Sequence, residues 1–358
     1  MIIVRILKRA GLTVAMISLL ITTACGGTKA GEPGKQQDSS SSSEVITLKA
    51  ADSLPTSNDL SSEGIVYWMR QVEELTNGKV KFEHFPAEQL GKAKNMLDIT
   101  KNKVTDVSYI GVGYVPDKLP LSGVGELPGA ASSSVEATKA YWKVVQDLLL
   151  EKEFLKNGVR PMFAVVLPPY KVMTKGKPVQ TIEDLSGLKL RSGGGAQSFT
   201  LTSLGATPVS MPAPDTYTAL ERKTIDGVIF PLTSIKPYQL EKIVEYVTDN
   251  SNYGGFVATY CINEKVWQSL PEDIQQAMLK AGENSMNHLA SHLDDMNQKL
   301  QAEFKANGVQ FIEMDEQNFG KFDQIVKGIW DNWAKELDNR GLPGTEVKDA
   351  FKAALKGQ

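Results

Sequence analysis

The chain has 358 residues, with 39 basic and 42 acidic side chains and a formal net charge of −3 at pH 7. This mildly acidic balance argues against nucleic-acid binding, which would require a basic patch. The region from Val45 to the end exceeds the size at which one hydrophobic core keeps growing, so two lobes are expected.

The N-terminal residues are typical of a lipoprotein signal peptide. Three basic residues precede an apolar run, 10–21, that ends shortly before Cys25. The run is shorter than the about 20 residues that span a bilayer, and the small residues before Cys25 suit cleavage and lipid attachment. Thr22 stands where a leucine is usual, and an uncleaved anchor is the alternative. We expect residues 1–24 to be the signal peptide, whose removal changes the formal charge to −6.

Residues 25–44 are rich in Gly, Ser and Gln and predict a flexible linker behind the lipidated Cys25. The only other cysteine is Cys261, so lipidation of Cys25 leaves no partner for a disulfide in the mature chain. Cys261 lies among apolar neighbours in FVATYCINEKVW, which favours a buried structural thiol over a nucleophile.

The first half of the region alternates strand and helix patterns. Residues 46–50, 80–83 and 106–110 alternate apolar and polar side chains or are apolar, as strands do. Residues 57–75 and 90–97 carry apolar side chains at helical spacing. This alternation predicts an α/β fold with parallel strand pairing.

The second half repeats the scheme, with strand-like segments at 162–167, 188–191, 209 and 225–230 and helices at 196–204 and 214–221. The stretch 271–304 has apolar residues at mostly three- and four-residue steps and predicts one long amphipathic helix. At about 1.5 Å per residue it would be about 50 Å long, so we expect it to run along both lobes.

The strand at 188–191 ends with a basic residue. Arg191 ends this strand, and Gly193, Gly194 and Gly195 open the next helix. Glycines leave helix N–H groups uncovered, and a guanidinium offers two parallel donors to a carboxylate. The segment therefore predicts a site for a small anion, with an inter-lobe or surface salt bridge as the alternative for Arg191.

Other candidates follow strands of the first half: Asp52, Ser53, Ser108, Tyr109 and Tyr114. In open α/β sheets, ligands bind beyond the carboxyl ends of the strands. Taken singly, each of these residues is better explained by a structural role.

Several motifs, in this order and spacing, resemble the solute-binding proteins of tripartite ATP-independent periplasmic (TRAP) transporters, the DctP family. TNGKVKFEHFPAEQLG is similar to the family's TGGRVKVEIFPAGQLG, GLKLR to its GLKIR, and LPEDIQQAMLKAG to its LPEDLQKVLLEAA. The resemblance implies a class II type periplasmic-binding-protein fold with two lobes, a chain that crosses between them more than once, and a long helix that braces both. We expect lobe I at 45–168 plus 256–296, and lobe II at 169–255 plus 297–358.

The resemblance also implies that Arg191 binds the ligand's carboxylate. Where the family often has a ligand-contacting asparagine, this chain has Phe230, and Ala213 replaces an aromatic residue. Tyr170 and Lys171 match an element that carries a second arginine in some members. These departures favour a monocarboxylate with an apolar or aromatic body over a sugar acid, although an apolar side chain there can instead fill the lobe core.

We therefore predict an extracytoplasmic, lipid-anchored receptor that delivers a small carboxylate to TRAP permease subunits in the membrane. No cofactor, metal site or catalytic set is expected, because no cluster of oxygen ligands has Ca²⁺-loop spacing and no Ser/His/Asp or Cys/His pattern occurs. A ligand-sensing receptor for a signalling membrane protein is the alternative, and a secreted enzyme acting on small acids is a weaker one.

Overall fold

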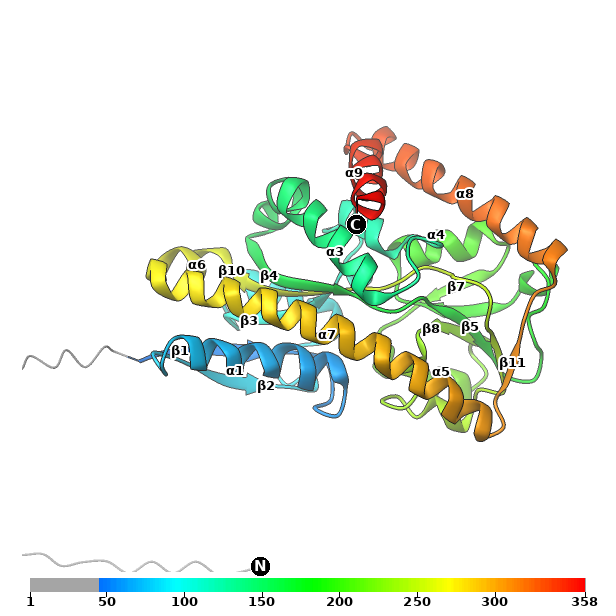
Figure 1. Ribbon diagram of the computed structural model, residues 1–358, viewed down its shortest axis with the longest axis horizontal. Helices are drawn as coiled ribbons and strands as arrows, with labels where there is room; N and C mark the ends of the chain where they lie inside the picture. Colours follow the sequence, from blue (N-terminus) through cyan, green and yellow to red (C-terminus); the bar gives the residue numbers. More distant parts are fainter. Residues whose placement is uncertain (1–44, 358) are drawn as a thin grey trace, which may run out of the picture. The chain divides into compact units, whose positions relative to one another are not determined.

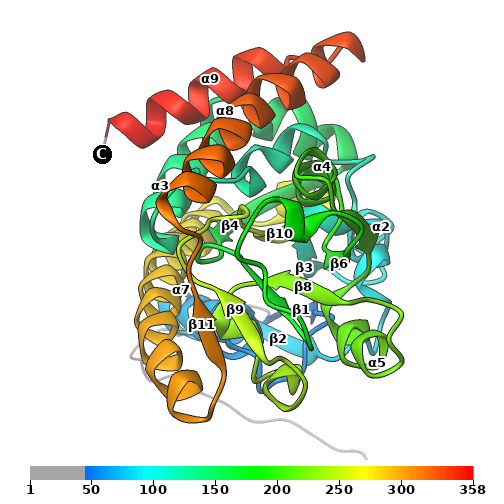
Figure 2. The same cartoon turned by 90° about the vertical axis from the view of Figure 1, so that its right-hand side faces the viewer.

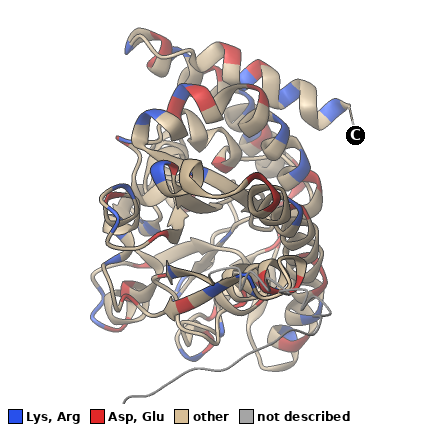
Figure 3. Cartoon of the chain, turned by 90° about the vertical axis from the view of Figure 1, so that its left-hand side faces the viewer, with Lys and Arg blue, Asp and Glu red and all other residues tan. Residues whose placement is uncertain are grey.

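The computed structural model describes residues 45–357 and arranges them around two mixed β-sheets with helices packed on them (Figure 1). The predicted signal peptide, Cys25 and the linker lie outside the described residues. No helix within residues 45–357 has both the length and the apolar character needed to cross a membrane. Acidic and basic residues are interspersed over the described elements (Figure 3).

The first sheet has the strand order β2-β1-β3-β10-β4. In β1, Leu48 and Ala50 are buried while Lys49 is exposed, which confirms the predicted alternation. β1 pairs in parallel with β2 and β3, whereas β10 runs antiparallel between β3 and β4. The expectation of parallel pairing is wrong for β10, because this strand returns from the second sheet. The strands are β1 (Ile46–Ala51), β2 (Val80–Phe85), β3 (Val107–Gly111), β4 (Val159–Val166) and β10 (Val257–Asn263).

The second sheet has the order β11-β9-β5-β8-β6-β7 (Figure 2). β6 lies in the interior of this sheet and pairs in parallel with β7 and β8, so both of its edges are hydrogen-bonded. β5 is antiparallel to β8 and β9. The strands are β5 (Lys171–Thr174), β6 (Lys189–Ser192), β7 (Thr207–Ser210), β8 (Gly227–Phe230), β9 (Tyr246–Thr248) and β11 (Gln310–Ile312).

The chain passes between the two sheets three times. It leaves the first sheet after β4, returns between β9 and β10, and leaves again before β11. The prediction that the chain crosses more than once is confirmed. Residues far apart in the sequence are thereby brought to the region between the sheets.

The helices pack on the faces of the two sheets. The α-helices are α1 (Val66–Leu75), α2 (Met96–Lys101), α3 (Ser134–Val144), α4 (Gly195–Ser203), α5 (Thr216–Glu221), α6 (Glu264–Ser269), α7 (Glu272–Ala306), α8 (Glu316–Asn339) and α9 (Gly344–Lys356). Two segments are π-helical, η1 (Leu60–Ile65) and η5 (Val145–Phe154). The 3₁₀ segments are η2 (Ala93–Asn95), η3 (Val112–Tyr114), η4 (Leu121–Glu126), η6 (Leu155–Asn157), η7 (Glu183–Leu185), η8 (Ala213–Asp215), η9 (Leu232–Ser234) and η10 (Leu240–Lys242).

The long helix α7 is present as predicted and has 35 residues. It contacts α1, α3 and β4 beside the first sheet and η9 beside the second (Figure 1). Gly282 lets α7 approach β4 closely, because a Cβ at this position would lie 2.2 Å from the carbonyl oxygen of Met162. The helix therefore links the elements of both sheets in one packed structure.

The C-terminal helices also contact both parts. α8 packs against α4, which follows β6, and α9 packs against α3, which precedes β4. Trp330 of α8 donates from Nε1 to the carbonyl of Pro128 at 2.8 Å. The lobe boundaries given above stay a prediction, and α9, assigned there to lobe II, packs on the first-sheet side.

Candidate functional site

Arg191 is the buried cation of the second sheet. It lies in β6 and its side chain is fully buried. Nε donates to the carbonyl of Met211 at 3.1 Å, whereas Nη1 and Nη2 have no hydrogen-bond acceptor among the described residues. A buried charge that lacks partners is costly, because its lost hydration is not replaced. The two nitrogens are therefore donors suited to a bound anion.

Aromatic rings lie next to the guanidinium group of Arg191. Arg191 Cζ lies 4.1 Å from the ring centroid of Phe230, the last residue of β8, in cation–π geometry. The Phe230 ring also lies 6.1 Å from that of Tyr170 and 6.0 Å from that of Tyr238. All three rings belong to the part of the chain around the second sheet, and they form an apolar wall beside the cation.

Tyr114 approaches the guanidinium group of Arg191 from the first-sheet part of the chain. It ends η3, just after β3, and its hydroxyl accepts a hydrogen bond from the backbone N–H of Ala213 at 3.2 Å. Its ring lies 4.9 Å from that of Phe256. Burial raises the pKa of Tyr114, and the nearby Arg191 guanidinium opposes this shift. Tyr114, Arg191 and Ala213 are thus brought together from both sheets.

The glycine run holds the two parts of the chain close together. Gly194 has φ +115° and a Cβ there would lie 2.4 Å from the carbonyl oxygen of Gly113, so only glycine allows this contact. The amide of Gly193 donates to Gln197 Oε1 at 2.6 Å, and Gln197 Nε2 donates to the carbonyl of Gly255 at 2.6 Å. The amide of Gly193 is therefore already bonded within the protein.

A buried carboxyl group lies next to Tyr114. Glu126, at the end of η4, accepts hydrogen bonds at Oε1 from the amides of Gly113 and Val257, both at 3.1 Å. Oε2 has no partner. Burial raises the pKa of Glu126 to about 8, although the two amides and Arg191 oppose this shift. At neutral pH the group is mainly the neutral acid.

Asp52 and Ser108 make their hydrogen bonds within the first-sheet part and not to Arg191. Asp52 is buried, and its carboxylate accepts from the amide of Leu54 and the hydroxyl of Ser61, both at 2.8 Å, and lies 2.9 Å from His84 Nε2. The hydroxyl of Ser108 lies 2.5 Å from that of Thr100. The polar atoms of both side chains are engaged within the first-sheet part.

Lys171 is also engaged elsewhere. Its ammonium group lies 2.7 Å from Asp249 Oδ1 and also donates to the carbonyl of Asp249. Lys171 and Asp249 line a pocket of about 530 Å³ that Phe319 and Phe322 of α8 also line. The role of a second cation beside Arg191 stays a prediction that this geometry does not support.

An open pocket lies at the edge of the aromatic wall. It has a volume of about 350 Å³ and is lined by Ser53 and Glu88 from the first-sheet part and by Tyr217 and Tyr238 from the second. Tyr238 lines this pocket and also stacks on Phe230, the residue that contacts Arg191. The hydroxyl of Tyr238 accepts from Asn58 Nδ2 at 3.2 Å.

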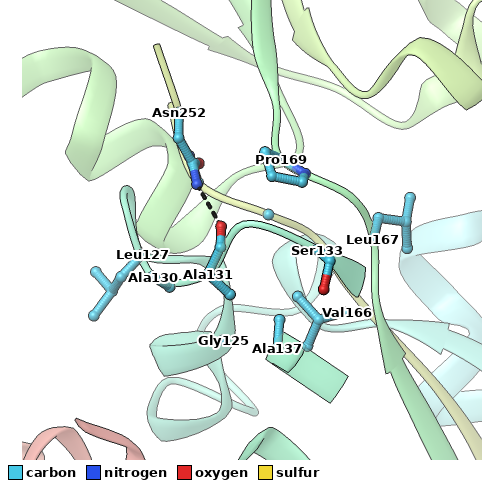
Figure 4. A pocket seen from close by; sticks show the side chains of 12 residues that line it. Gly125, Leu127, Ala130, Ala131, Ser133, Ala137, Val166, Leu167, Pro169 and Asn252 are labelled. Carbon is cyan, nitrogen blue, oxygen red and sulfur yellow. Dashed lines mark hydrogen bonds between the residues drawn. The ribbon is translucent and has the colours of Figure 1, made fainter. Parts of the chain in front are cut away.

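A much smaller cavity of about 10 Å³ lies where the connections between the sheets meet (Figure 4). Asn252 and Ala131 are joined beside it by a hydrogen bond of 2.9 Å. This volume is about that of one water molecule, so it cannot hold an organic ligand.

The described residues contain no group of three or more His, Cys, Asp and Glu side chains arranged to hold a metal ion. Cys261 is buried in β10, and burial raises the pKa of its thiol to about 12. A thiol that stays protonated is a poor nucleophile, which agrees with the structural role expected for Cys261.

Sequence reasoning missed Glu126, Gln197, Tyr238 and Phe256. Gln197 carries a signal in hindsight, because a polar side chain in the first turn after a glycine run can bond the free amides. The other three come from distant segments, and no local pattern marks them.

Comparison with known proteins agrees with this geometry. The family model described as bacterial extracellular solute-binding protein, family 7 (DctP), matches residues 51–336. The C4-dicarboxylate-binding periplasmic protein DctP of Rhodobacter capsulatus is 24% identical over 315 residues, which cover 82% of this chain and 86% of the relative.

Two solved structures show the same fold. A TRAP periplasmic solute-binding protein from Bordetella bronchiseptica, bound to (R)- and (S)-mandelate, has a TM-score of 0.80 at 22% identity. The match covers 87% of this chain and 99% of that structure. A TRAP solute-binding protein from Rhodoferax ferrireducens, in complex with copurified benzoate, has a TM-score of 0.81 at 22% identity, covering 87% and 98%.

The expected two-lobed periplasmic-binding-protein fold is thus confirmed, with one sheet in each lobe. The matched segment includes Arg191, Phe230 and Tyr114, the residues that meet between the two sheets. The chain therefore belongs to the DctP family of bacterial extracellular solute-binding proteins, the periplasmic solute receptors of TRAP transporters.

Proposed function

We propose that this receptor binds a small monocarboxylate with an apolar or aromatic body and delivers it to a TRAP permease. The observation that carries the proposal is the Arg191 guanidinium, fully buried and with two nitrogens that lack an acceptor. A carboxylate matches this pair of donors in two parallel hydrogen bonds, which are stronger in a dry site than in water.

The aromatic wall supports the choice of ligand body. Phe230 stacks on Arg191, and Tyr170 and Tyr238 extend the ring surface. A sugar acid would need several hydrogen-bonding partners along its hydroxyl groups, because leaving them unpaired in a buried site is costly. An aromatic acid needs mainly apolar contact there.

Related structures span both ligand types. Proteins of this fold are bound to mandelate and to benzoate, as described above, and the sugar acid binding protein from Advenella mimigardefordensis is in complex with galactonate at a TM-score of 0.78. The fold therefore does not decide the ligand. The aromatic side chains beside Arg191 support the choice of an aromatic acid.

Two contacts join the lobes around the site. Ala213 N–H donates to the Tyr114 hydroxyl, and Asn58 Nδ2 donates to the Tyr238 hydroxyl, both at 3.2 Å. Each links a segment after a strand of the first sheet to a segment after a strand of the second. A ligand held between Arg191 and these segments would favour the closed arrangement through its higher affinity for that state.

A binding panel tests the proposal. The mature protein is screened by thermal shift and calorimetry against benzoate, mandelate, galactonate and succinate. Aromatic monocarboxylates should raise the melting temperature, since ligand at about 100 times Kd adds about 2.7 kcal/mol to the free energy of unfolding. Tight binding of galactonate or succinate, with no binding of the aromatic acids, would refute the proposed ligand class.

The lipid anchor and the permease contact are part of the same proposal. Lipidation of Cys25 would keep the receptor at the outer face of the membrane, next to its permease. Mass spectrometry of the protein from its own cell envelope should find an acylated N-terminal Cys25, and Cys25→Ser should release the receptor from the membrane. An unmodified, intact N-terminus would refute the anchor.

A further inference from the structure

Glu126 has one oxygen that is fixed and one that is free of protein partners. Oε1 accepts from the amides of Gly113 and Val257, which come from the segments after β3 and at the start of β10. These two bonds fix the orientation of the carboxyl group. Oε2 is buried and has no hydrogen-bond partner among the described residues.

Oε2 lies close to two glycines, one in η3 and one in the first turn of α4. A Cβ on Gly113 would lie 3.1 Å from Oε2, and a Cβ on Gly195 would lie 4.0 Å from it. Glycine at both positions lets the backbone of η3 and of the first turn of α4 lie close to Oε2. This is the turn that follows Arg191 in the chain.

Charged and titratable groups face Glu126 from several elements. The groups that interact with it electrostatically are Arg191 in β6, Tyr114 in η3, Tyr141 in α3 and Tyr170 between β4 and β5. Arg191 is the cation of this set. The three tyrosines are buried, and burial raises the pKa of each, so they stay neutral up to high pH.

The proton on Glu126 decides what Oε2 can do. With a pKa of about 8, raised mainly by burial, Glu126 carries a proton at pH 7. Because Oε1 already accepts two hydrogen bonds, the proton belongs on Oε2, which then becomes a donor without an acceptor. Nη1 and Nη2 of Arg191, the cation that interacts electrostatically with Glu126, are also buried donors without an acceptor among the described residues. A single carboxylate would provide acceptors for all three.

We propose that Glu126 is a ligand-binding residue whose Oε2–H donates a hydrogen bond to the carboxylate that Arg191 binds. The inference rests on the proposed function and extends it, because it assigns a second group to the recognition of the carboxylate. O–H···O⁻ hydrogen bonds are short and strong, and no proton needs to be transferred. The receptor therefore binds its anion only in the form in which Glu126 is protonated.

A second buried acid shows what a purely structural carboxyl group looks like in this chain. Glu153 accepts from the amides of Leu121 and Ser122 and from the hydroxyl of Ser122, so both of its oxygens are engaged. Burial also raises its pKa, to about 7. Because the hydrogen bonds of both Glu153 oxygens are made within the protein, Glu153 serves as the matched control.

The test is the pH dependence of affinity, measured by calorimetry with whichever aromatic monocarboxylate of the panel binds best. For wild type, Kd should be constant from pH 6 to about 7.5 and should weaken above pH 8, approaching about tenfold per pH unit. Affinity weakens on the alkaline side because Glu126, with its raised pKa, loses its proton above pH 8. The proton must then be taken up again when the ligand binds. Benzoate keeps its negative charge throughout this range.

Glu126→Gln keeps the shape and a donor but cannot titrate. It should bind within about threefold of wild type at pH 7 and lose the weakening above pH 8, whereas Glu126→Ala should weaken binding about 10- to 100-fold at pH 7. Glu153→Gln should lower the melting temperature but keep the wild-type pH profile of Kd. A wild-type profile in Glu126→Gln, or wild-type affinity in Glu126→Ala, would overturn the inference.

A measurement on wild type alone guards against variants that fail to fold. At pH 9, binding should take up close to one proton, seen as a dependence of the binding enthalpy on the buffer's ionisation enthalpy; zero uptake would overturn the inference. If Arg191→Ala loses binding while Glu126→Ala does not, only the role of Glu126 fails. If no monocarboxylate binds to wild type, the proposed function itself fails.

Discussion

Arg191 and Asp52 are both buried charges at the carboxyl end of a strand, one in each sheet, but their hydrogen bonding is opposite. The carboxylate of Asp52 is engaged by Leu54, Ser61 and His84. The guanidinium of Arg191 has one bond, to Met211, and two nitrogens without an acceptor. Since buried polar groups are nearly always paired, the satisfied charge serves the fold, and the unsatisfied one points to a ligand.

The largest effect should come from Arg191→Ala. Affinity for the bound monocarboxylate should fall by about 2–5 kcal/mol, because the ligand's carboxylate would be buried without its charged partner. The unliganded protein should stay folded, since the only hydrogen bond lost is the one to Met211. Calorimetry of ligand binding and urea unfolding measure the two effects separately.

Arg191→Lys is the matched control. It keeps the positive charge but loses the planar pair of donors, so its affinity should lie between those of wild type and Arg191→Ala. Unchanged affinity in Arg191→Ala would show that this buried cation, like Asp52, serves only the fold.

Asp52→Ala should show the reverse pattern. It removes the acceptor of three buried or part-buried donors, so the free energy of unfolding should fall by about 2–3 kcal/mol. Affinity should change little at temperatures where the variant is folded. Asp98→Ala is the control, because Asp98 is half exposed and its loss should stay within about 0.5 kcal/mol. A loss of affinity without a loss of stability would place Asp52 in the binding site.

Phe230→Leu should give an intermediate effect on affinity. Leucine keeps most of the apolar volume but removes the ring that lies 4.1 Å from Arg191, so affinity for an aromatic acid should fall by about 1 kcal/mol. Phe163→Leu is the control, because Phe163 stacks on Tyr260 in the first sheet at 4.2 Å and has no cation beside it. That variant should lose stability only. Equal losses of affinity in Phe230→Leu and Phe163→Leu would show that the contact between Phe230 and Arg191 has no specific role in binding.

The fold was largely predictable from local patterns. The long helix at 272–306, strand 46–51 and the strand that carries Arg191 all have a strong apolar period or a clear boundary at glycine or proline. β10 was missed because all seven of its residues are buried between two neighbouring strands, so its sequence lacks the alternation of a half-exposed strand. Its antiparallel direction depends on a crossing between lobes that no local pattern encodes.

The candidate site residues were predictable from the sequence only where a local motif marks them. Arg191 and Phe230 lie on neighbouring strands of one sheet, and the motif around each points to the ligand region. Glu126 escaped notice because its partners, Gly113 and Val257, are 144 positions apart and meet only through the crossing connections. The ion pair of Lys171 was not predicted for a related reason, since the sequence does not show that Asp249 is its partner.

Lys171→Met should have the smallest effect on affinity. It tests whether a charge that is paired within the protein can still contribute to ligand binding. The ammonium group of Lys171 is satisfied by Asp249, as the carboxylate of Asp52 is by its donors, so affinity should stay within about threefold. Stability should fall by less than about 1 kcal/mol, because Asp249 keeps Gln301 at 2.5 Å and Lys305 at 3.8 Å. Lys305→Met removes the more distant cation and should change affinity no more than Lys171→Met does. A tenfold loss of affinity confined to Lys171→Met would instead mean that this lysine leaves Asp249 when the ligand binds, and that a paired charge in this fold can also serve the ligand.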